Sequence, residues 1–248
     1  MSGRGVLVTG GSRGIGRAIA AAFAEQGDRV AIHHRDSAGQ AESLLAGLKG
    51  QGHAIVRADL ADPDDVRHMV DAAAKALDGG IDVLVNNAGV FLHHPVTELT
   101  YEEWQAAWRQ TIDVNLTGAA NVTWCALRHM ASGSRIVNVS SRGAFRGEPD
   151  SPAYGASKAG LNAFGQSLAI ALGPRGIAVA TVAPGFVETD MTNEHLKNPR
   201  GDAIRAQSPF GRVARPEEIA AAVVYLASPA AEWASGAVLD LNGASYLR

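Results

Sequence analysis

At 248 residues, with 46% hydrophobic and 19% charged side chains, the chain has the length and composition of a globular protein with a full core. A formal net charge of -3 gives no sign of a surface for nucleic acid or for an anionic membrane. The single cysteine, Cys125, excludes an internal disulfide framework and a thiolate metal site within one chain.

The first residues run directly into a strand-like segment, without the apolar stretch of a secretion signal. No apolar run reaches the length of a membrane-spanning helix. We therefore expect a cytoplasmic protein that binds neither a membrane nor nucleic acid.

Strand-like apolar runs alternate with longer helical patterns. Strands are predicted at 5–9, 29–34, 53–58, 81–86, 135–140, 178–182 and 237–240. Helices are predicted near 14–26, 38–49, 62–78, 100–131, 152–173 and 215–228. The alternation predicts an α/β Rossmann fold, with a doubly wound, mostly parallel sheet of seven strands and helices on both faces. No linker-like stretch interrupts it, so residues 1–248 are predicted to form a single domain.

The first predicted strand ends in a glycine-rich turn, and a helix follows at once. Glycines let the backbone turn tightly and approach a pyrophosphate, whose charge is favoured at a helix N-terminus. The spacing is T-G-x-x-x-G-x-G, which differs from the usual G-x-G-x-x-G. A purely structural turn is the alternative. We predict that the turn binds a dinucleotide through Gly10, Ser12, Arg13, Gly14, Ile15 and Gly16.

The end of the second predicted strand bears on the choice of cofactor. An acidic side chain there would bind the ribose 2'-hydroxyl of NAD, and this chain has His34 at that place. Arg35 follows, and Arg13 lies in the glycine turn. Two guanidiniums suit a 2'-phosphate, so NADP(H) is favoured. Asp36 keeps NAD(H) open as the alternative.

The next two predicted strands also end in candidate cofactor residues. Asp59, followed by Leu60, could accept a hydrogen bond from the adenine amino group, or could instead be an acid of the next helix's first turn. The fourth strand ends in Asn86, Asn87, Ala88 and Gly89. The two amides can tie neighbouring strands together, and the small residues leave space for a ribose; a wholly structural role is the alternative.

A proton-transfer pair is predicted where a helix begins at Pro152, with Ser151 as its N-cap. Tyr154 and Lys158 then lie four residues apart on one helical face. An ammonium about 4 Å from the phenol would favour the phenolate by roughly 4 kcal/mol at an effective dielectric near 20. We therefore expect a lowered pKa for Tyr154, with a hydroxyl from Ser141 beside the same substrate oxygen. The alternative is an ordinary surface tyrosine and lysine.

Taken together, these motifs resemble the short-chain dehydrogenase/reductase family over essentially the whole chain. The shared features are the glycine turn, Asn86-Asn87-Ala88-Gly89, Ser141, Tyr154-x-x-x-Lys158 and the segment from Pro184 to Thr189. The 3-oxoacyl-(acyl-carrier-protein) reductase branch is the most similar, through Gly-Ser-Arg-Gly-Ile-Gly, Ala156-Ser-Lys-Ala-Gly, Pro-Gly-Phe-Val-Glu-Thr-Asp-Met and Arg215-Pro-Glu-Glu.

The resemblance implies roles for individual residues. Tyr154 would donate a proton to a carbonyl, Lys158 would lower its pKa and hold the nicotinamide ribose, and Ser141, thirteen residues before the tyrosine, would orient the substrate oxygen. Asn115 matches the fourth catalytic residue of the family, which supports a water-linked proton relay. The nicotinamide end of the cofactor site would comprise Pro184, Gly185, Val187 and Thr189.

The resemblance also implies a substrate class. A 3-oxoacyl thioester comes first, and a small ketone, sugar or cyclic alcohol is the alternative. Carrier-protein reductases of this branch have basic residues at two helix ends; Arg175 matches one position, and Ser132 occupies the other. One rival function is a non-catalytic NADP(H)-binding regulator, but such a protein would be expected to lack a catalytic residue. Another is a redox-neutral lyase, which the intact glycine turn disfavours.

Three further features give predictions about a lid, a metal site and the oligomeric state. The segment 188–215 is expected to form a lid over the substrate. His93 and His94 follow the fourth strand without further ligands at a workable spacing, so pocket lining or plain loop is expected and no metal site is predicted. The helix from Pro152 carries a series of small residues; the resemblance implies a homotetramer built on it, and packing against the sheet is the alternative.

Overall fold

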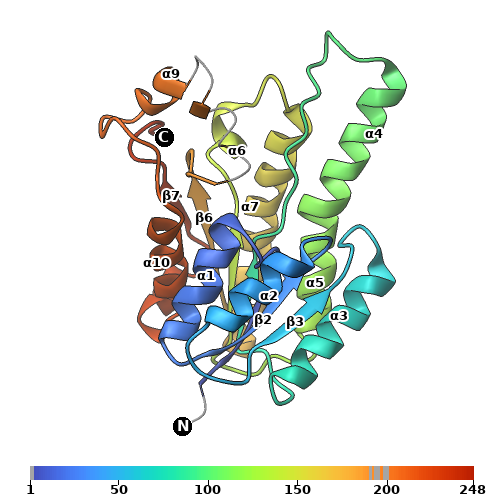
Figure 1. Cartoon of the computed structure of the whole chain (residues 1–248), viewed down its shortest axis with the longest axis vertical. Helices are drawn as coiled ribbons and strands as arrows, with labels where there is room; N and C mark the ends of the chain where they lie inside the picture. The colour runs from blue at the N-terminus through green and yellow to red at the C-terminus, as the bar shows by residue number, and fades with distance from the viewer. Residues whose placement is uncertain (1–2, 190–191, 193–195, 198–200) are drawn as a thin grey trace.

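A computed structural model describes residues 3–189, 192, 196–197 and 201–248. Its seven strands form one fully parallel sheet in the order β3-β2-β1-β4-β5-β6-β7 (Figure 1). The strands are β1 (Gly5–Val8), β2 (Arg29–His34), β3 (Ala54–Arg57), β4 (Val83–Asn86), β5 (Arg135–Val139), β6 (Ala178–Pro184) and β7 (Val238–Leu241).

The strand order reverses between β1 and β4. The chain runs outward from β1 to β3 and then returns to β4 on the other side of β1. A parallel sheet has a crevice at such a switch point, beyond the carboxyl ends of its strands. The topology therefore places the ends of β1 and β4, with their glycines and asparagines, at the natural position for a ligand.

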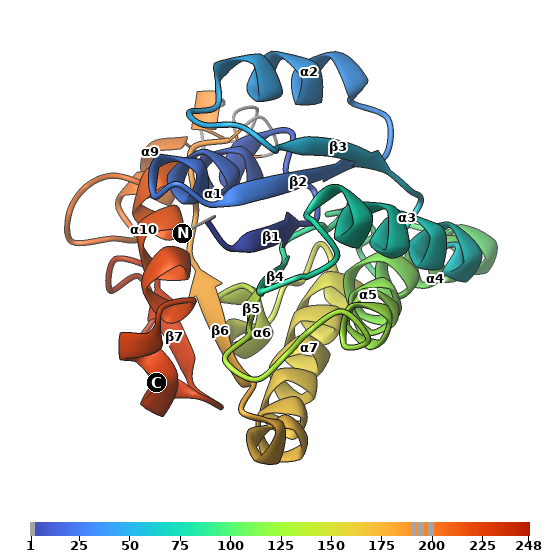
Figure 2. The same cartoon turned by 90° about the horizontal axis from the view of Figure 1, so that it is seen from below.

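Helices cover both faces of the sheet (Figure 2). One core contains Val6 and Val8 of β1 and joins the sheet to α1 (Gly14–Glu25), α2 (Ala38–Gly47) and α10 (Pro216–Leu226). The other contains Leu7 and joins it to α3 (Pro63–Ala76), α5 (Ala119–Ala126) and α7 (Pro152–Leu172). Successive residues of β1 point to opposite faces, as the period of a strand requires. The predicted doubly wound fold is confirmed.

Sequence signals explain where several helices begin. The Asp62 carboxylate accepts hydrogen bonds from the first turn of α3, and Pro63 is its first residue. Thr100 and Glu103 form a reciprocal capping box at the start of α4 (Tyr101–Ile112). These local interactions fix the entry of each helix before its apolar face packs on the sheet.

The helix predicted over 100–131 differs in the structure. It consists of α4, a π-helical segment η1 (Asp113–Gly118) and α5, which ends at Ala126. A π-helical turn contains one more residue than an α-helical turn, and such segments are often found at functional sites. Here the segment carries Asn115.

Within the described ranges, four short elements were not predicted from the sequence. They are α6 (Gly143–Arg146), η2 (Gly173–Arg175), α9 (Gly201–Arg205) and η3 (Pro229–Ala234). The longest of them has six residues, too few for a periodic pattern to identify.

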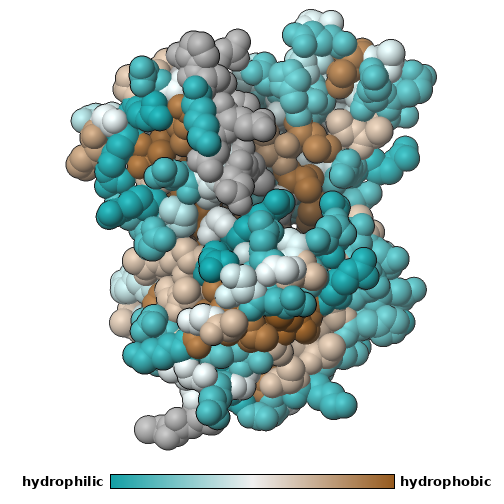
Figure 3. All heavy atoms as spheres, viewed as in Figure 1, coloured by the Kyte–Doolittle hydropathy of each residue, from teal (hydrophilic) through white to brown (hydrophobic). Residues whose placement is uncertain are grey.

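The surface drawn in Figure 3 is mostly hydrophilic, with hydrophobic groups mainly recessed between polar side chains. None of the helices in the described ranges combines the length and the hydrophobicity needed to cross a bilayer.

Candidate active site

A cleft of about 510 Å³ lies at the carboxyl ends of the strands. All the residues predicted to bind the cofactor line this cleft, as do Ser141, Tyr154 and Lys158. Asn115 is the one predicted site residue that does not line it. The fold therefore brings together segments that are up to about 180 residues apart in the sequence, from Gly10 to Thr189.

The glycine turn forms one wall of the cleft. Gly10 has a φ of 62°, in the left-handed region that favours glycine. A Cβ atom on Gly16 would lie 2.2 Å from the Gly10 carbonyl oxygen, so only glycine fits there. The Asn87 amide donates to the carbonyl oxygens of Thr9 and Gly10, at 2.9 and 3.2 Å. The turn is thus held open to the cleft by packing and by a side chain from β4's end.

A buried histidine that the sequence analysis did not select supports the same turn. The Nδ1 atom of His33 accepts a hydrogen bond from the Gly10 N–H at 3.0 Å, so Nε2 carries the proton and faces the Ala58 carbonyl at 3.2 Å. Burial lowers the His33 pKa from 6.5 to about 4. His33 therefore connects the ends of β1, β2 and β3 as a neutral ring. The available signal was a polar residue within an apolar strand.

Histidine and arginine occupy the end of the cleft where an adenosine would lie. His34 is 6% exposed, and its Nδ1 has no hydrogen-bond partner among the described residues. Arg35 is exposed and pairs with Asp36 at 2.5 Å. Asp59 lines the cleft and accepts a hydrogen bond from the Ala61 N–H, while Asp62 caps α3. The first turn of α3 has its own acids, Asp64 and Asp65, so the alternative role of Asp59 there is filled by other residues.

Ser141, Tyr154 and Lys158 lie together at the opposite end. The Lys158 ammonium donates to the Val139 carbonyl at 2.9 Å and lies 5.8 Å from the centre of the Tyr154 ring. The Ser141 hydroxyl oxygen accepts a hydrogen bond from the Gly143 N–H at 3.0 Å. Ser140, by contrast, donates to the Lys158 carbonyl within the fold. This arrangement leaves Ser141, rather than Ser140, as the hydroxyl directed to the tyrosine.

The expected low pKa of Tyr154 is wrong. Burial raises the Tyr154 pKa to about 12, a hydrogen bond with Ser141 opposes the rise, and the charge of Glu148 adds to it. Burial also lowers the Lys158 pKa to about 8. The reason is that desolvation outweighs attraction where the ammonium is directed to a backbone carbonyl instead of the phenol.

Asn115 lies directly behind the cleft and is fully buried. Its side chain bonds both backbone groups of Val90, with the N–H donating at 2.8 Å and the carbonyl accepting at 3.0 Å, and it also donates to Ser157. A Cβ atom on Gly89 would lie 3.3 Å from the Asn115 amide oxygen and 3.5 Å from the Lys158 ammonium. Asn115 therefore fixes the backbone of Gly89 and Val90, which separates its side chain from Lys158.

His94 has a definite role at the start of α7. It is fully buried; its Nδ1 donates to the Leu92 carbonyl at 2.7 Å and its Nε2 accepts from the Ala153 N–H at 3.0 Å. Ser151 occupies the predicted N-cap position, but its hydroxyl donates to the Leu92 carbonyl instead of capping the helix. The histidine ring thus supplies the cap that the serine was predicted to give.

Two other predictions concern metals and the lid. Among the described residues, no three His, Cys, Asp or Glu side chains gather in a way that could hold a metal ion. The predicted lid, 188–215, includes 190–191, 193–195 and 198–200, which lie outside the described residues. Its described parts include Thr189, which lines the cleft, and α9.

Comparison with known proteins assigns the family. A family model described as enoyl-(acyl carrier protein) reductase matches residues 10–243. A short-chain dehydrogenase from Burkholderia cenocepacia, solved in complex with NADP, is 37% identical, with a TM-score of 0.89 and 98% of each chain covered. The chain belongs to the short-chain dehydrogenase/reductase family. The predicted family is confirmed, and membership makes the chain an oxidoreductase.

Relatives within the short-chain dehydrogenase/reductase family have different named substrates. The 3-oxoacyl-[acyl-carrier-protein] reductase FabG of Vibrio cholerae is 38% identical over 100% of this chain and 99% of its own. The cis-4-hydroxycyclohexanecarboxylate dehydrogenase of Sinomonas cyclohexanicum is 41% identical over 97% and 95%. Similar identity to both leaves the substrate of this family member open.

Proposed function

We propose that the protein is an NADP(H)-dependent reductase or dehydrogenase that interconverts a carbonyl group and a secondary alcohol. The observation that carries this proposal is the convergence of Ser141, Tyr154 and Lys158 at one end of a cleft whose other end carries Arg13 and Arg35. Membership of an oxidoreductase family supports it. A non-catalytic NADP(H)-binding regulator is disfavoured because these groups and Asn115 are all present.

The cleft fits a dinucleotide with a 2'-phosphate. The close approach of Gly16 to Gly10 leaves a backbone surface free of side chains, as a pyrophosphate requires. His34, which lines the cleft, stands in place of an acid, and its buried Nδ1 has no hydrogen-bond partner among the described residues. The NADP complex of the Burkholderia relative supports NADP(H) as the cofactor. Asp36 pairs with Arg35 and would compete with the 2'-phosphate for it, so NAD(H) is kept as the second cofactor candidate.

The chain's own groups would supply proton transfer and orientation. When bound, the cofactor supplies or accepts the hydride. In reduction, the Tyr154 hydroxyl would give its proton to the carbonyl oxygen while the carbonyl carbon accepts the hydride that the cofactor would supply, and the alcohol would result. A pKa near 12 keeps this tyrosine protonated over the physiological range. Ser141 would hold the same oxygen, Lys158 the nicotinamide ribose, and Asn115 would support proton return to the lysine.

A 3-oxoacyl thioester is the first substrate we propose, because of the likeness to the Vibrio reductase. A carrier protein as partner has weaker support: Arg175 donates to the Leu127 and Met130 carbonyls at the end of α5, and Ser132 lies beside Gly176. A small ketone, sugar or cyclic alcohol is the second candidate, favoured by the likeness to the cyclohexanecarboxylate dehydrogenase.

We also propose that the protein is cytoplasmic and forms a homotetramer. On α7, Ala156, Ala159, Ala163 and Ser167 are exposed rather than packed on the sheet. Ile170 at the end of this row is 81% exposed, and Trp124 of the neighbouring α5 is 65% exposed. An apolar surface of this kind on two adjacent helices supports contact with a second copy.

The test is loss of NADPH absorbance with an acetoacetyl thioester, beside a panel of small ketones. Turnover is expected, and Tyr154→Phe should reduce kcat by a factor of about 10² to 10⁴, the range for loss of a general acid. Arg35→Asp should lower the affinity for NADPH relative to that for NADH. Asp36→Asn, which frees Arg35 from its ion pair, should raise the affinity for NADPH relative to that for NADH. Equal turnover by the Tyr154→Phe variant would contradict the mechanism, and turnover of ketones alone would move the substrate to the second candidate.

A further inference from the structure

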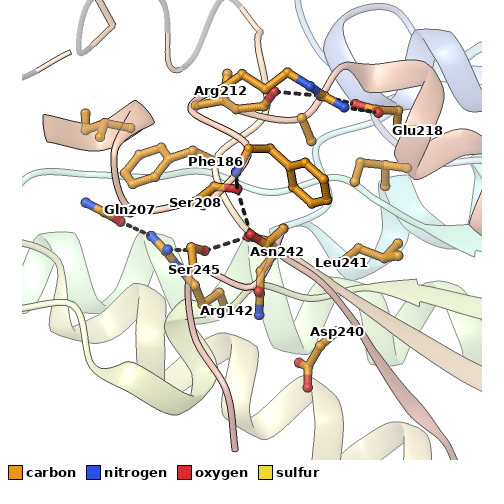
Figure 4. A pocket seen from close by; sticks show the side chains of 16 residues that line it. Arg142, Phe186, Gln207, Ser208, Arg212, Glu218, Asp240, Leu241, Asn242 and Ser245 are labelled. Atoms are coloured by element: carbon orange, nitrogen blue, oxygen red, sulfur yellow. Dashed lines mark hydrogen bonds and ion pairs between the residues drawn. The ribbon is translucent and has the colours of Figure 1, made fainter. Parts of the chain in front are cut away.

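A second cavity, of about 340 Å³, lies behind the segment Pro184 to Val187 (Figure 4). The side chain of Phe186 lines this cavity, whereas its neighbours Gly185 and Val187 line the cofactor cleft. The remaining walls come from α9, α10 and the segments 207–214 and 240–245. One extended segment therefore separates the two cavities.

A buried guanidinium points into this second cavity. Arg142 is 3% exposed, and it lies between Gln207 and Ser245 in Figure 4. It donates to the Gln207 amide oxygen at 2.9 Å and to the Ser245 hydroxyl at 2.5 Å, and it stacks 5.3 Å from the centre of the Phe186 ring. Both acceptors are neutral. None of the ion pairs between described residues includes Arg142.

Positive charge is in excess at this point. The Gln207 amide oxygen accepts a second hydrogen bond, from Arg146, at 3.2 Å. Glu148 lies 4.0 Å from Arg146, and its charge also acts on Arg142, although the two do not form an ion pair. Among the described residues, these two guanidiniums therefore share one carboxylate. The other charged groups lining the cavity are paired, Arg212 with Glu218 at 2.7 Å and Asp240 with Arg248 at 2.8 Å.

An unpaired buried charge is costly unless a partner supplies the opposite charge. Burial and the nearby Arg146 lower the Arg142 pKa to about 10 against the opposing charge of Glu148, so the group is still a cation at neutral pH. A guanidinium has five N–H donors in a fork that matches the two oxygens of a carboxylate. The two neutral acceptors of Arg142 leave part of this fork for a ligand.

We propose that the cavity is a binding site for a small apolar monocarboxylate. Its carboxylate pairs with Arg142 beside Gln207, and its apolar body lies against Phe186, Phe210 and Leu241. One negative charge balances the single unpaired guanidinium, which is why a monocarboxylate fits better than a phosphate dianion. Because the Pro184 to Val187 segment stands between the cavity and Tyr154, the carboxylate is a second ligand and no part of the reacting substrate.

Binding of benzoate, with benzamide as the uncharged analogue of the same shape, tests the site. The full chain is titrated at constant ionic strength, and its Tm is followed. A saturable rise with benzoate and none with benzamide is expected. An equal response to the two compounds, or no response to either, would overturn the proposal. Where turnover is measurable, benzoate competitive with the carbonyl substrate would overturn the separate location.

Two variants at Gln207 make a matched pair that leaves the buried arginine in place. Gln207→Glu places a carboxylate where the two guanidiniums converge, so it should raise the Tm without ligand and abolish the benzoate response. Gln207→Leu should lower the Tm and keep the response. Arg142→Gln should weaken benzoate at least about tenfold, as loss of a charged hydrogen bond predicts. The proposal fails if Gln207→Glu binds benzoate as the wild type does.

Discussion

At the scale of single residues, burial decides the charge states in the cleft. The Tyr154 phenol and the Lys158 ammonium were expected to stabilise each other's charged forms. Instead, the Tyr154 pKa rises to about 12 and the Lys158 pKa falls to about 8, so each group is pushed towards its neutral form. Spacing along a helix places two groups on one face, but it does not say which neighbour the ammonium bonds.

His33 yields a prediction about stability and pH. Its pKa is about 4 in the folded protein and 6.5 as the reference for the unfolded chain. Between these values the unfolded chain binds more protons, so falling pH favours unfolding. The contribution of neutral His33 to the free energy of unfolding is intact above pH 6.5 and is lost as the pH falls towards 4. In full, this contribution amounts to about 3 kcal/mol.

The measurement is the free energy of unfolding of the wild type and of His33→Asn across this pH range. An asparagine oxygen can replace the Nδ1 acceptor for the Gly10 N–H without titrating. The wild type should therefore lose stability faster than the variant between pH 6.5 and 4. Two curves that fall in parallel would show that His33 does not titrate as the structure indicates.

The limits of sequence reasoning are clear from such residues. Gly10, Tyr154 and the other motif residues could be placed because backbone geometry and spacing restrict them to a few residue types. His33 and His94 carry no motif, because each is defined by partners distant in the chain, such as Gly10 for the first and Ala153 for the second. The Arg142 cavity was likewise not predictable, since no motif links Arg142 to the residues around it, such as Gln207 and Ser245.

At the scale of elements, tertiary contacts set details that local propensity leaves open. The long helix predicted over 100–131 exists in outline, but it contains the π-helical segment that carries Asn115. The Asn115 side chain, bonded to both backbone groups of Val90, ties this segment to the chain after β4. Hydrophobic periodicity could not locate the extra residue of the π-helical turn, because a single added residue rotates the apolar face of the helix by only part of a turn.

The start of α7 gives a prediction for His94. His94→Phe keeps an aromatic ring beside Trp104, whose centre lies 5.7 Å away, but leaves the buried Ala153 N–H unpaired. The expected cost is about 1–3 kcal/mol of the free energy of unfolding, as for any buried donor without a partner. Because Tyr154 is the next residue, kcat should also fall, whereas the KM for NADPH should not change.

Ser151→Ala is the control for this prediction. It removes one of two hydrogen bonds to the Leu92 carbonyl, and the bond from His94 remains. We therefore expect a smaller loss of stability than in His94→Phe, measured by denaturant unfolding of both variants. If the two substitutions cost the same, the histidine is not the group that fixes the helix start.

At the scale of the whole molecule, two groups of exposed apolar side chains bear on the assembly. Trp124 and Ile170 lie on α5 and α7, which cover one face of the sheet, and Tyr225, Trp233 and Leu239 lie on or next to α10 and the edge strand β7. Figure 2 shows α5 and α7 on a different side of the molecule from α10 and β7. Two different self-complementary surfaces are what a tetramer with three twofold axes requires.

This arrangement predicts a stepwise dissociation. Light scattering of the wild type should give four times the subunit mass of 25.8 kDa. Ile170→Asp adds a charge to a side chain that is 81% exposed in the subunit, so the fold should be unaffected while one interface is lost. The variant should therefore be a dimer with the wild-type circular dichroism spectrum. Ser43→Asp, which adds the same charge to an exposed site on α2, should remain a tetramer. A monomeric wild type would refute the assembly, and a tetrameric Ile170→Asp protein would place the contact elsewhere than on α7.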